Sequence, residues 1–222
     1  MTKKLWEASL HEKKNSILYQ YEKFISKQFN KKFYLKYQHI LNWSIKNSDD
    51  FWSSIWDFSE TIGIKNKKKI KKSKIFYKNI FLPGTKLNFA ENLLCKNNKD
   101  KAVTFISENG FREEKNWQQL NYKSSKVFKF LKDIKIKKND RVAGYLPNSI
   151  EAVEAFIGTV ALGSIWSSCS PDFGTKGLIE RFSQINPKVL FVADKYFYNG
   201  KVINVLERVP KILKEIKSIK YV

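Results

Sequence analysis

The second half of the chain alternates short β-type runs with helical patterns, and this alternation limits the possible folds more than any other feature. The β-type runs lie at 102–106, 142–146, 164–166 and 189–193. Apolar residues recur at helical spacing between them, and the β and α patterns repeat at intervals of roughly 25 residues. Consecutive units of this kind predict an α/β fold, with a mostly parallel sheet and helices on both of its faces.

Turn and cap residues lie at several ends of these runs. Asn109-Gly110 predicts a tight hairpin turn after the first run. Asn148, with Glu151 three residues later, predicts a capping box at the start of an apolar helix. Because ligands bind at the carboxyl ends of parallel strands, the segments that follow the strands are the first place to search for a site.

The rest of this half is predicted as helix, with one strand at the end. Thr175 is placed to cap a helix that ends at Asn186-Pro187. Apolar residues between 202 and 216 have helical spacing, which predicts one helix or two helices joined at Pro210. Residues 219–222 are β-type again. We therefore assign 101–222 to one α/β domain.

Residues 1–60 differ from this pattern, because they are helical in character and rich in aromatic side chains. Ser48 or Asp49 is placed to cap a helix that carries Phe51, Trp52 and further large apolar residues on one side. We interpret this side as an ordinary buried helix face. The alternative, a platform on which nucleic-acid bases stack, requires exposed aromatic rings. The sequence thus predicts an aromatic-rich helical segment over 1–60, within an N-terminal segment, 1–100, that precedes the α/β domain.

The net charge of +21 invites an assignment as a nucleic-acid-binding protein. The type of basic residue argues against it, because 38 of the 42 are Lys, whereas base readout and bidentate phosphate contacts favour Arg. Lys, Ile and Asn together account for 78 of 222 residues, which is typical of a coding bias toward A/T-rich codons. Residues 141–200 carry five basic and five acidic residues and are therefore neutral. We do not expect nucleic acid as a partner.

The densest cluster of lysines lies at 65–74 and contains neither Arg nor Gly. A solvated linker between the helical segment and the α/β domain is the interpretation we favour. A patch that contacts a polyanion is the alternative, since closely spaced lysines also attract phosphate-bearing ligands. The cluster itself does not decide between them.

Cysteine and histidine usage favours a reducing compartment without a metal site. Cys95 and Cys169 are too few for a disulfide framework, and His11 and His39 show no metal-ligand spacing. The lysines near the N-terminus are not followed by the apolar segment of a secretory signal. The longest uncharged stretch, 155–171, is too polar to span a membrane. We expect a cytoplasmic protein without a membrane partner.

No residue stands out as catalytic. Glu151 and Glu154 lie three apart on one predicted helix, where carboxylates in the first turn favour the helix dipole more often than they perform acid–base chemistry. Cys169 has no neighbouring base or cation that would lower the pKa of its thiol. The glycines at 158 and 163 repeat the spacing of a phosphate-binding loop but lack its lysine.

Two loops that follow strands remain as candidates for ligand binding. Ser167–Gly174 is small and polar, so a ligand can approach its backbone closely. Tyr196–Lys201 combines aromatic side chains with a lysine, which suits stacking and charge pairing with a nucleotide-like ligand. Each loop taken alone is equally compatible with an ordinary surface turn.

Several sequence phrases resemble those of a known family. They are LNWS at 41–44, DFWS at 50–53, IWDF at 55–58, LPGTKLNFAENLL at 82–94, IWSSCSPDFG at 165–174 and PKVLFVAD at 187–194. These phrases extend over most of the chain and resemble the acetoacetyl-CoA synthetases (acetoacetate–CoA ligases). This group is a branch of the adenylate-forming acyl-CoA synthetases, close to the acetyl-CoA synthetases. The phrase WSSCSPDF looks specific to the acetoacetyl branch.

The resemblance implies part of an adenylate-forming N-domain and a reaction in two steps. Acetoacetate and ATP give an acyl-adenylate and pyrophosphate, and the CoA thiol then displaces AMP, with Mg²⁺ offsetting phosphate charge. Such enzymes use a Ser/Thr/Gly-rich phosphate loop and a mobile C-terminal domain with a catalytic lysine, and this sequence contains neither. We therefore expect an N-terminal fragment that is inactive alone, for which a complementary C-terminal polypeptide is one conceivable partner.

The resemblance also assigns cofactor-binding roles to five residues. Ser170, Pro171 and Asp172 match a family loop beside the pantetheine channel. Gly200 and Lys201 match the Gly–Arg pair that acetyl-CoA synthetases place near the CoA nucleotide, although the first arginine of that motif is Tyr198 here. Two alternatives stay open: a basic nucleic-acid-binding domain, and a non-catalytic module that binds CoA or a partner.

Overall fold

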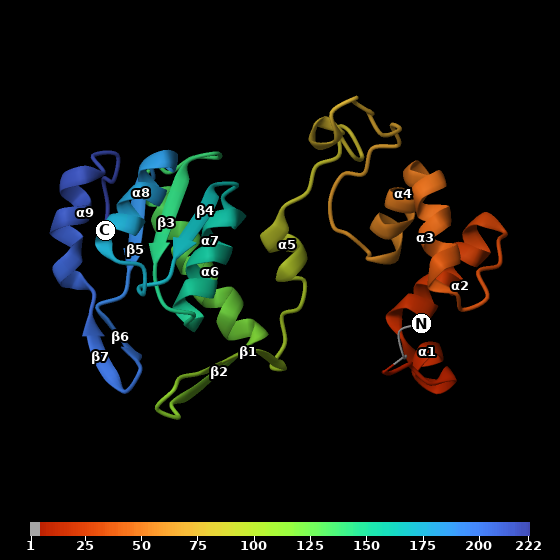
Figure 1. The fold of residues 1–222 in the computed structure, drawn as a ribbon. Coiled ribbons are helices and arrows are strands. Elements are labelled where there is room, and N and C mark those ends of the chain that lie inside the picture. Colours follow the sequence, from red (N-terminus) through yellow and green to blue (C-terminus); the bar gives the residue numbers. More distant parts are fainter. Residues whose placement is uncertain (1–4) are drawn as a thin grey trace. The chain divides into compact units, whose positions relative to one another are not determined.

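The computed structural model describes residues 5–222 and divides into two compact units, one up to Leu87 and one over Asn88–Val222 (Figure 1). Residues 1–4 lie outside the described part. They begin the N-terminal stretch that we predicted to lack a secretory signal. The assignment of 1–100 to an N-terminal segment and of 101–222 to the α/β domain of a synthetase stays a prediction. Within residues 5–222, no helix is sufficiently long and apolar to cross a bilayer.

Over residues 5–87, the N-terminal unit contains four α-helices and the short 3-10 helix η1 (Phe76–Lys78). The α-helices are α1 (Leu10–Asn15), α2 (Ile17–Phe29), α3 (Tyr37–Lys46) and α4 (Ser48–Phe58). An aromatic core forms between α2, α3 and α4, and its buried members are Tyr21, Ile25, Phe33, Ile40 and Trp43. The Tyr21 hydroxyl, which is buried with this core, lies 2.8 Å from the Ser54 hydroxyl of α4. The predicted aromatic, helical character of this segment is confirmed.

Helix α4 carries the predicted aromatic stripe. Its N-cap is Asn47, whose side chain makes no capping hydrogen bond, so the expected caps Ser48 and Asp49 lie one and two residues inside the helix. Phe51 packs on the aromatic core, and Trp52 is 40% exposed and lies edge-on to Phe81. The stripe is therefore a half-buried packing face.

The lysine-rich segment folds back within the N-terminal unit instead of separating it from the next unit. Antiparallel bridges join Ile64 to Lys86 and Lys71 to Ile80. The Lys65 ammonium forms an ion pair with Asp57 at 2.6 Å. The linker interpretation failed because backbone pairing between residues 22 and 9 positions apart cannot be read from local composition.

A three-stranded parallel sheet forms the centre of the C-terminal unit. Its strands are β3 (Arg141–Tyr145), β4 (Ile165–Cys169) and β5 (Val189–Val192), in the order β4-β3-β5. The register pairs Ala143 with Ser167 on one side and with Leu190 on the other. Tyr221 makes a further parallel bridge to Val189, in the segment predicted to begin a strand. The predicted parallel α/β architecture is confirmed.

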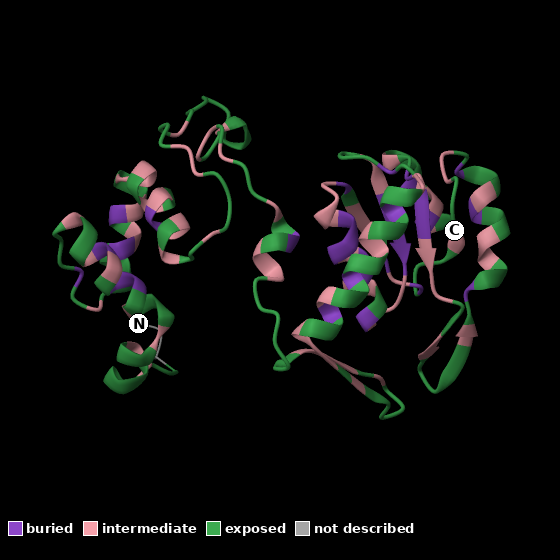
Figure 2. Cartoon of the chain, turned by 180° about the vertical axis from the view of Figure 1, so that it is seen from behind, coloured by how far each residue is buried: buried purple, intermediate pink, exposed green. Residues whose placement is uncertain are grey.

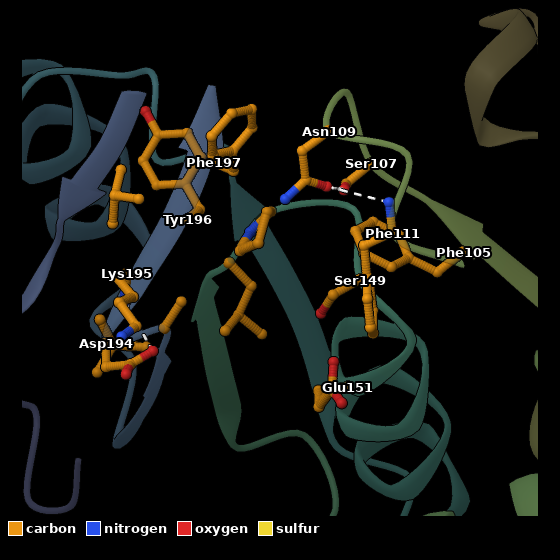
Figure 3. Close-up of a pocket in the computed structure, with 15 residues that line it drawn as sticks. Phe105, Ser107, Asn109, Phe111, Ser149, Glu151, Asp194, Lys195, Tyr196 and Phe197 are labelled. Carbon is orange, nitrogen blue, oxygen red and sulfur yellow. Dashed lines mark hydrogen bonds between the residues drawn. The ribbon is translucent and has the colours of Figure 1, made fainter. Parts of the chain in front are cut away.

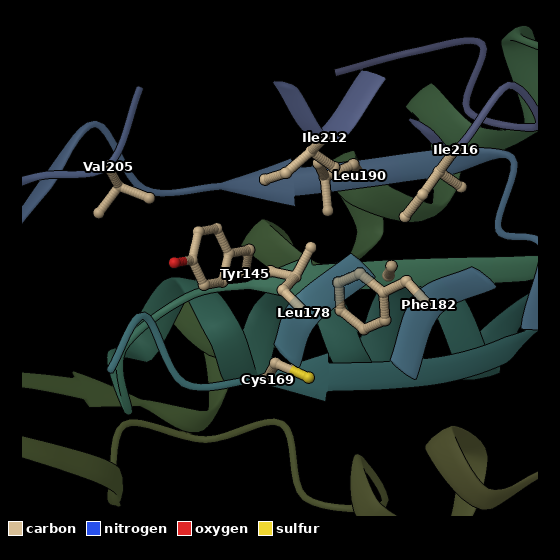
Figure 4. Close-up of a cluster of buried hydrophobic side chains, with 9 residues drawn as sticks. Tyr145, Cys169, Leu178, Phe182, Leu190, Val205, Ile212 and Ile216 are labelled. Atoms are coloured by element: carbon tan, nitrogen blue, oxygen red, sulfur yellow. The ribbon is translucent and has the colours of Figure 1, made fainter. Parts of the chain in front are cut away.

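Helices cover both faces of this sheet, as the alternation of side chains along β3 requires (Figure 1). Helices α6 (Trp117–Asp133) and α7 (Ile150–Ala161) lie on one side, where Val142 points. Helices α8 (Thr175–Ile185) and α9 (Val209–Glu215) lie on the other side, where Tyr145 and Phe182 are fully buried (Figure 4). Figure 2 shows the buried residues concentrated on the central strands and the inner helix surfaces.

Three smaller elements complete the unit. They are α5 (Phe89–Leu93) and the hairpins β1–β2 (Lys101–Ile106 and Arg112–Asn116) and β6–β7 (Lys195–Tyr198 and Lys201–Asn204). The first hairpin turns at the predicted Asn109-Gly110, where Gly110 has a φ of 81°. The 3-10 turn η2 (Leu206–Arg208) leads from β7 into α9.

Two predictions about helix ends are wrong. The N-cap of α7 is Ser149, without a side-chain capping bond, so Asn148 and Glu151 do not form a capping box. The N-cap of α8 is Gly174, and Thr175 is its first helical residue. The observed starts of α7 and α8 differ by one residue from the predicted starts. Several neighbouring polar residues can serve as N-caps, and tertiary packing selects among them.

Candidate functional site at the carboxyl edge of the sheet

A pocket lies beyond the carboxyl ends of β3 and β5, where the fold places ligand sites (Figure 3). Its volume is about 640 Å³. Its lining comes from four segments: the β1–β2 hairpin, the loop from β3 into α7, the end of β5, and the β6–β7 hairpin. Polar groups at the pocket include Ser149 and Glu151, which Figure 3 shows at the start of α7. A pocket that combines apolar side chains with polar and charged groups suits a small organic ligand.

The tips of the two hairpins are joined to each other. The backbone N–H of Asn199, in the β6–β7 turn, donates to a carboxylate oxygen of Glu108 in the β1–β2 turn at 2.6 Å. Phe105 and Phe111 face the pocket from one hairpin, and Tyr196 and Phe197 line it from the other (Figure 3). The two hairpins therefore form opposite walls that are connected at one end.

The β6–β7 hairpin corrects two predictions. Tyr196–Lys201 was expected to be a loop, and residues from 202 onward were expected to be helical. Instead, Tyr198 pairs with Lys201 across a two-residue turn in which Asn199 and Gly200 have φ values of 49° and 73°. Asn-Gly is the sequence most typical of this turn. That signal was present, but the helical spacing of the following valines and isoleucines concealed it.

The loop after β4 brings together three of the predicted residues. The Ser170 hydroxyl donates to Asp172 at 2.7 Å, and the Tyr196 hydroxyl donates to the other oxygen of the same carboxylate at 2.8 Å. Pro171 is buried. Because these side-chain bonds occupy Ser170 and Asp172, the loop offers mainly its backbone to a ligand.

The bond to Asp172 changes the acidity of Tyr196. Partial burial and the negative carboxylate both oppose the phenolate form, which raises the pKa of the Tyr196 hydroxyl to about 12. Tyr196 therefore stays neutral at physiological pH and acts as a hydrogen-bond donor to the loop. It is unsuited to act as a general base near pH 7.

The same loop is held from its other side. The guanidinium of Arg208 donates through Nη1 to the Pro171 carbonyl at 2.8 Å and to the Tyr145 hydroxyl at 2.6 Å. Tyr145, which has no exposed surface, lies 2.9 Å from the Phe173 carbonyl through its hydroxyl oxygen. Arg181 of α8 stacks on the Phe173 ring, 4.2 Å from its centroid.

The remaining two predicted residues lie elsewhere on the unit. Gly200 and Lys201 are exposed at the turn of the β6–β7 hairpin. Over residues 5–222, no hydrogen bond or ion pair joins Lys201 to the Ser170–Asp172 loop. Tyr196, at the base of the same hairpin, supplies the contact to that loop. The five predicted residues therefore form two groups connected through one hairpin.

Other residues considered on sequence grounds have structural roles. Burial raises the pKa of the Cys169 thiol, which keeps it protonated. Glu154 is almost buried on α7 and forms an ion pair with Lys115 of β2 at 2.8 Å, so it does more than favour a helix dipole. Within residues 5–222, no three His, Cys, Asp or Glu side chains cluster as metal ligands.

Sequence reasoning did not identify Tyr145 or Arg208. One signal for Arg208 was available, because only four basic residues in the chain are arginines. Where lysine is so strongly favoured, an arginine marks a position that needs several donors in one plane. Arg141 fits this rule as well, since it donates to the backbone carbonyls of Ile185 and Asn186.

Comparisons with known proteins identify relatives of this chain. The acetoacetyl-CoA synthetases of Rattus norvegicus and Gallus gallus are 33% and 34% identical to the chain over 190 residues. The acetoacetyl-coenzyme A synthetase of Rhizobium meliloti (strain 1021) is 36% identical over 180 residues. These alignments cover 84%, 84% and 81% of this chain, and the chain spans 28% of each relative.

A solved structure supports the fold. The acetoacetyl-CoA synthetase from Streptomyces lividans superposes with a TM-score of 0.91 at 24% sequence identity, over 99% of this chain and 34% of that one. The sequence pattern described as AMP-binding enzyme matches residues 94–221, which is more than half of the chain. The chain therefore belongs to the AMP-binding enzyme family.

Proposed function

We propose that this chain is part of an acetoacetate–CoA ligase, which joins acetoacetate to CoA with conversion of ATP to AMP and pyrophosphate. In this proposal, the loop Ser170–Phe173 and the β6–β7 hairpin belong to the surface that binds CoA. The observation that carries it is the position of that loop, which follows a sheet strand and presents mainly backbone at the carboxyl edge. The family membership and the names of the relatives support the reaction class.

The hairpin suits a ligand that has both an aromatic base and phosphates. Tyr196 and Tyr198 lie on one strand with their ring centroids 6.4 Å apart, and Lys195 and Lys201 lie at the two ends of the hairpin pairing. Aromatic rings stack with a base, and ammonium groups attract phosphate. Lys201 thus takes the phosphate-contacting role in this proposal, and Tyr198 offers a ring where acetyl-CoA synthetases have an arginine.

Lys201→Glu is expected to weaken CoA binding to the chain about fivefold in low salt, since one exposed charged contact contributes at most about 1 kcal/mol. Isothermal titration calorimetry with CoA measures this change. Lys217→Glu is the matched control, because Lys217 is also an exposed lysine but lies outside the hairpin. The difference in CoA affinity between Lys201→Glu and the unmodified chain should vanish at 1 M salt. Equal effects of the two variants would remove Lys201 from the site.

We further propose that the chain alone does not form an acyl-adenylate. Its sequence contains no Ser/Thr/Gly-rich phosphate loop, and adenylate formation requires groups that stabilise charge on the phosphates. Acetoacetate-dependent exchange of labelled pyrophosphate into ATP is expected to equal the protein-free background. Exchange well above that background, which persists in protein purified by two independent routes, would refute this part of the proposal.

A further inference from the structure

Three separate elements contact the loop Ser170–Phe173, and Arg208 belongs to one of them. Tyr145 reaches the loop from the end of β3, Tyr196 from β6, and Arg208 from η2. Each contact is a hydrogen bond of 2.9 Å or less. A surface turn needs no such support, because its backbone groups can bind water. The convergence indicates that the position of this loop matters.

The donors and acceptors at Nη1 of Arg208 match one another in number. Nη1 of the guanidinium carries two hydrogens, and it has two acceptors: the Pro171 carbonyl and the Tyr145 hydroxyl oxygen. The Tyr145 hydroxyl has a single proton, and Arg208 already donates to its oxygen. That proton is therefore free for the Phe173 carbonyl at 2.9 Å, which is closer than the Pro171 carbonyl at 3.1 Å. Two carbonyls of the loop are thus satisfied in fixed directions.

Lysine would not reproduce this arrangement. An ammonium group at the end of a flexible chain is a point charge, whereas the planar guanidinium holds its hydrogens in set directions. Tyr145 is completely buried, so its hydroxyl cannot exchange Arg208 for bulk water without movement of the core. The charge on Arg208 also acts on Tyr196, whose hydroxyl binds the same loop at Asp172, between Pro171 and Phe173.

We propose that Arg208, acting through Tyr145, is a positioning residue that fixes the backbone of Ser170–Phe173 for contact with CoA. This role rests on the proposed function, in which that loop belongs to the CoA surface. Arg208 does not need to touch the ligand, since its Nη1 donors are directed at the protein. Without Arg208, the loop would sample other conformations. The apparent affinity for CoA would then fall with the fraction of the chain that holds the binding-competent conformation.

The test uses the full 222-residue chain and the variants Arg208→Met, Arg208→Lys and Tyr145→Phe. Arg112→Met is the matched control, because Arg112 is also in this unit but pairs with Glu114 on an exposed strand. Hydrogen exchange of the Ser170, Asp172 and Phe173 amides, measured without CoA, reports the loop directly. Calorimetry with CoA then reports the affinity.

In Arg208→Met we expect loop amide exchange about tenfold faster and CoA affinity about tenfold lower. Arg208→Lys should recover part of the slow loop exchange and part of the CoA affinity. Arg112→Met should change neither the loop exchange nor the CoA affinity. Exchange of the β3 and β5 amides should remain unchanged, which separates a local effect from unfolding. Tyr145→Phe should resemble Arg208→Met in the loop amides, because it removes the shared hydroxyl.

The outcomes distinguish this inference from the proposed function. Unchanged hydrogen exchange of the loop amides in Arg208→Met overturns the positioning role, whatever the CoA affinity of this variant is. Faster exchange with unchanged CoA affinity also overturns it, because the loop would then be mobile without consequence for binding. If the unmodified chain does not bind CoA at all, the proposed function of the loop fails, and the positioning role for CoA fails with it, while the exchange data still establish what holds the loop.

Discussion

Gly158→Val is expected to destabilise the C-terminal unit by more than about 3 kcal/mol. Gly158 lies on α7 where this helix crosses α6, and it is buried. A Cβ atom there would lie 2.6 Å from Cβ of Val127 and 2.8 Å from the backbone oxygen of Ser124. Neither neighbour can rotate away, because both atoms are fixed to the backbone of α6. The helices would have to separate, and Val adds two further methyl groups to the clash.

The control is a glycine substitution in a helix that has space. Gly177 lies in the first turn of α8, and the nearest atom to an added Cβ is on Phe173 at an ordinary 3.8 Å. Gly177→Ala should be neutral or stabilising by up to about 1 kcal/mol, since alanine favours helix. Native-state hydrogen exchange on the α6 and α7 amides measures both variants within the intact chain. A loss below about 1 kcal/mol for Gly158→Val would mean that the two helices are not held at this separation.

The regular part of the fold could be predicted because its signal is local. Strands such as β5 appear as short apolar runs, and α6 shows apolar residues at helical spacing, so each is marked by its own residues. The β6–β7 hairpin was missed because Val202 and Val205 fit a helical spacing as well as a strand. The Asn199-Gly200 turn would have decided the question if turn chemistry had been given more weight than periodicity.

The site was less predictable than the fold, because it depends on contacts between residues far apart in sequence. The resemblance pointed to Ser170, Pro171 and Asp172 as a loop, but it could not show that Tyr196 binds Asp172 from 24 positions away. It gave no reason to connect Tyr145 and Arg208, which are 63 positions apart. Such pairings are created by the sheet, which brings the ends of its strands and the following segments to one edge.

A second long-range pair connects the fold to the pocket. Lys115 of β2 binds Glu154 of α7 at 2.8 Å, and their side chains are only 13% and 9% exposed. The strand β2 belongs to the hairpin that supplies Phe105 and Phe111 to the pocket, and the start of α7 supplies Ser149 and Glu151 to the same pocket. The ion pair therefore holds one wall of the pocket against the helix that borders it.

Lys115→Met is expected to cost about 3 kcal/mol of stability, because it leaves the nearly buried Glu154 carboxylate without its partner. The double variant Lys115→Met/Glu154→Leu should regain most of that loss, since it removes both charges and fills a similar volume. Burial opposes the charged Lys115 ammonium, but the bond to Glu154 and the charge of Glu113 outweigh this and raise its pKa. The stabilisation is therefore complete below about pH 10, the ordinary lysine value, and is lost as the pH rises through the higher folded-state pKa. Hydrogen exchange of the β2 and α7 amides near pH 7 measures all variants, and strictly additive effects of the two substitutions would show that the pair contributes no coupling.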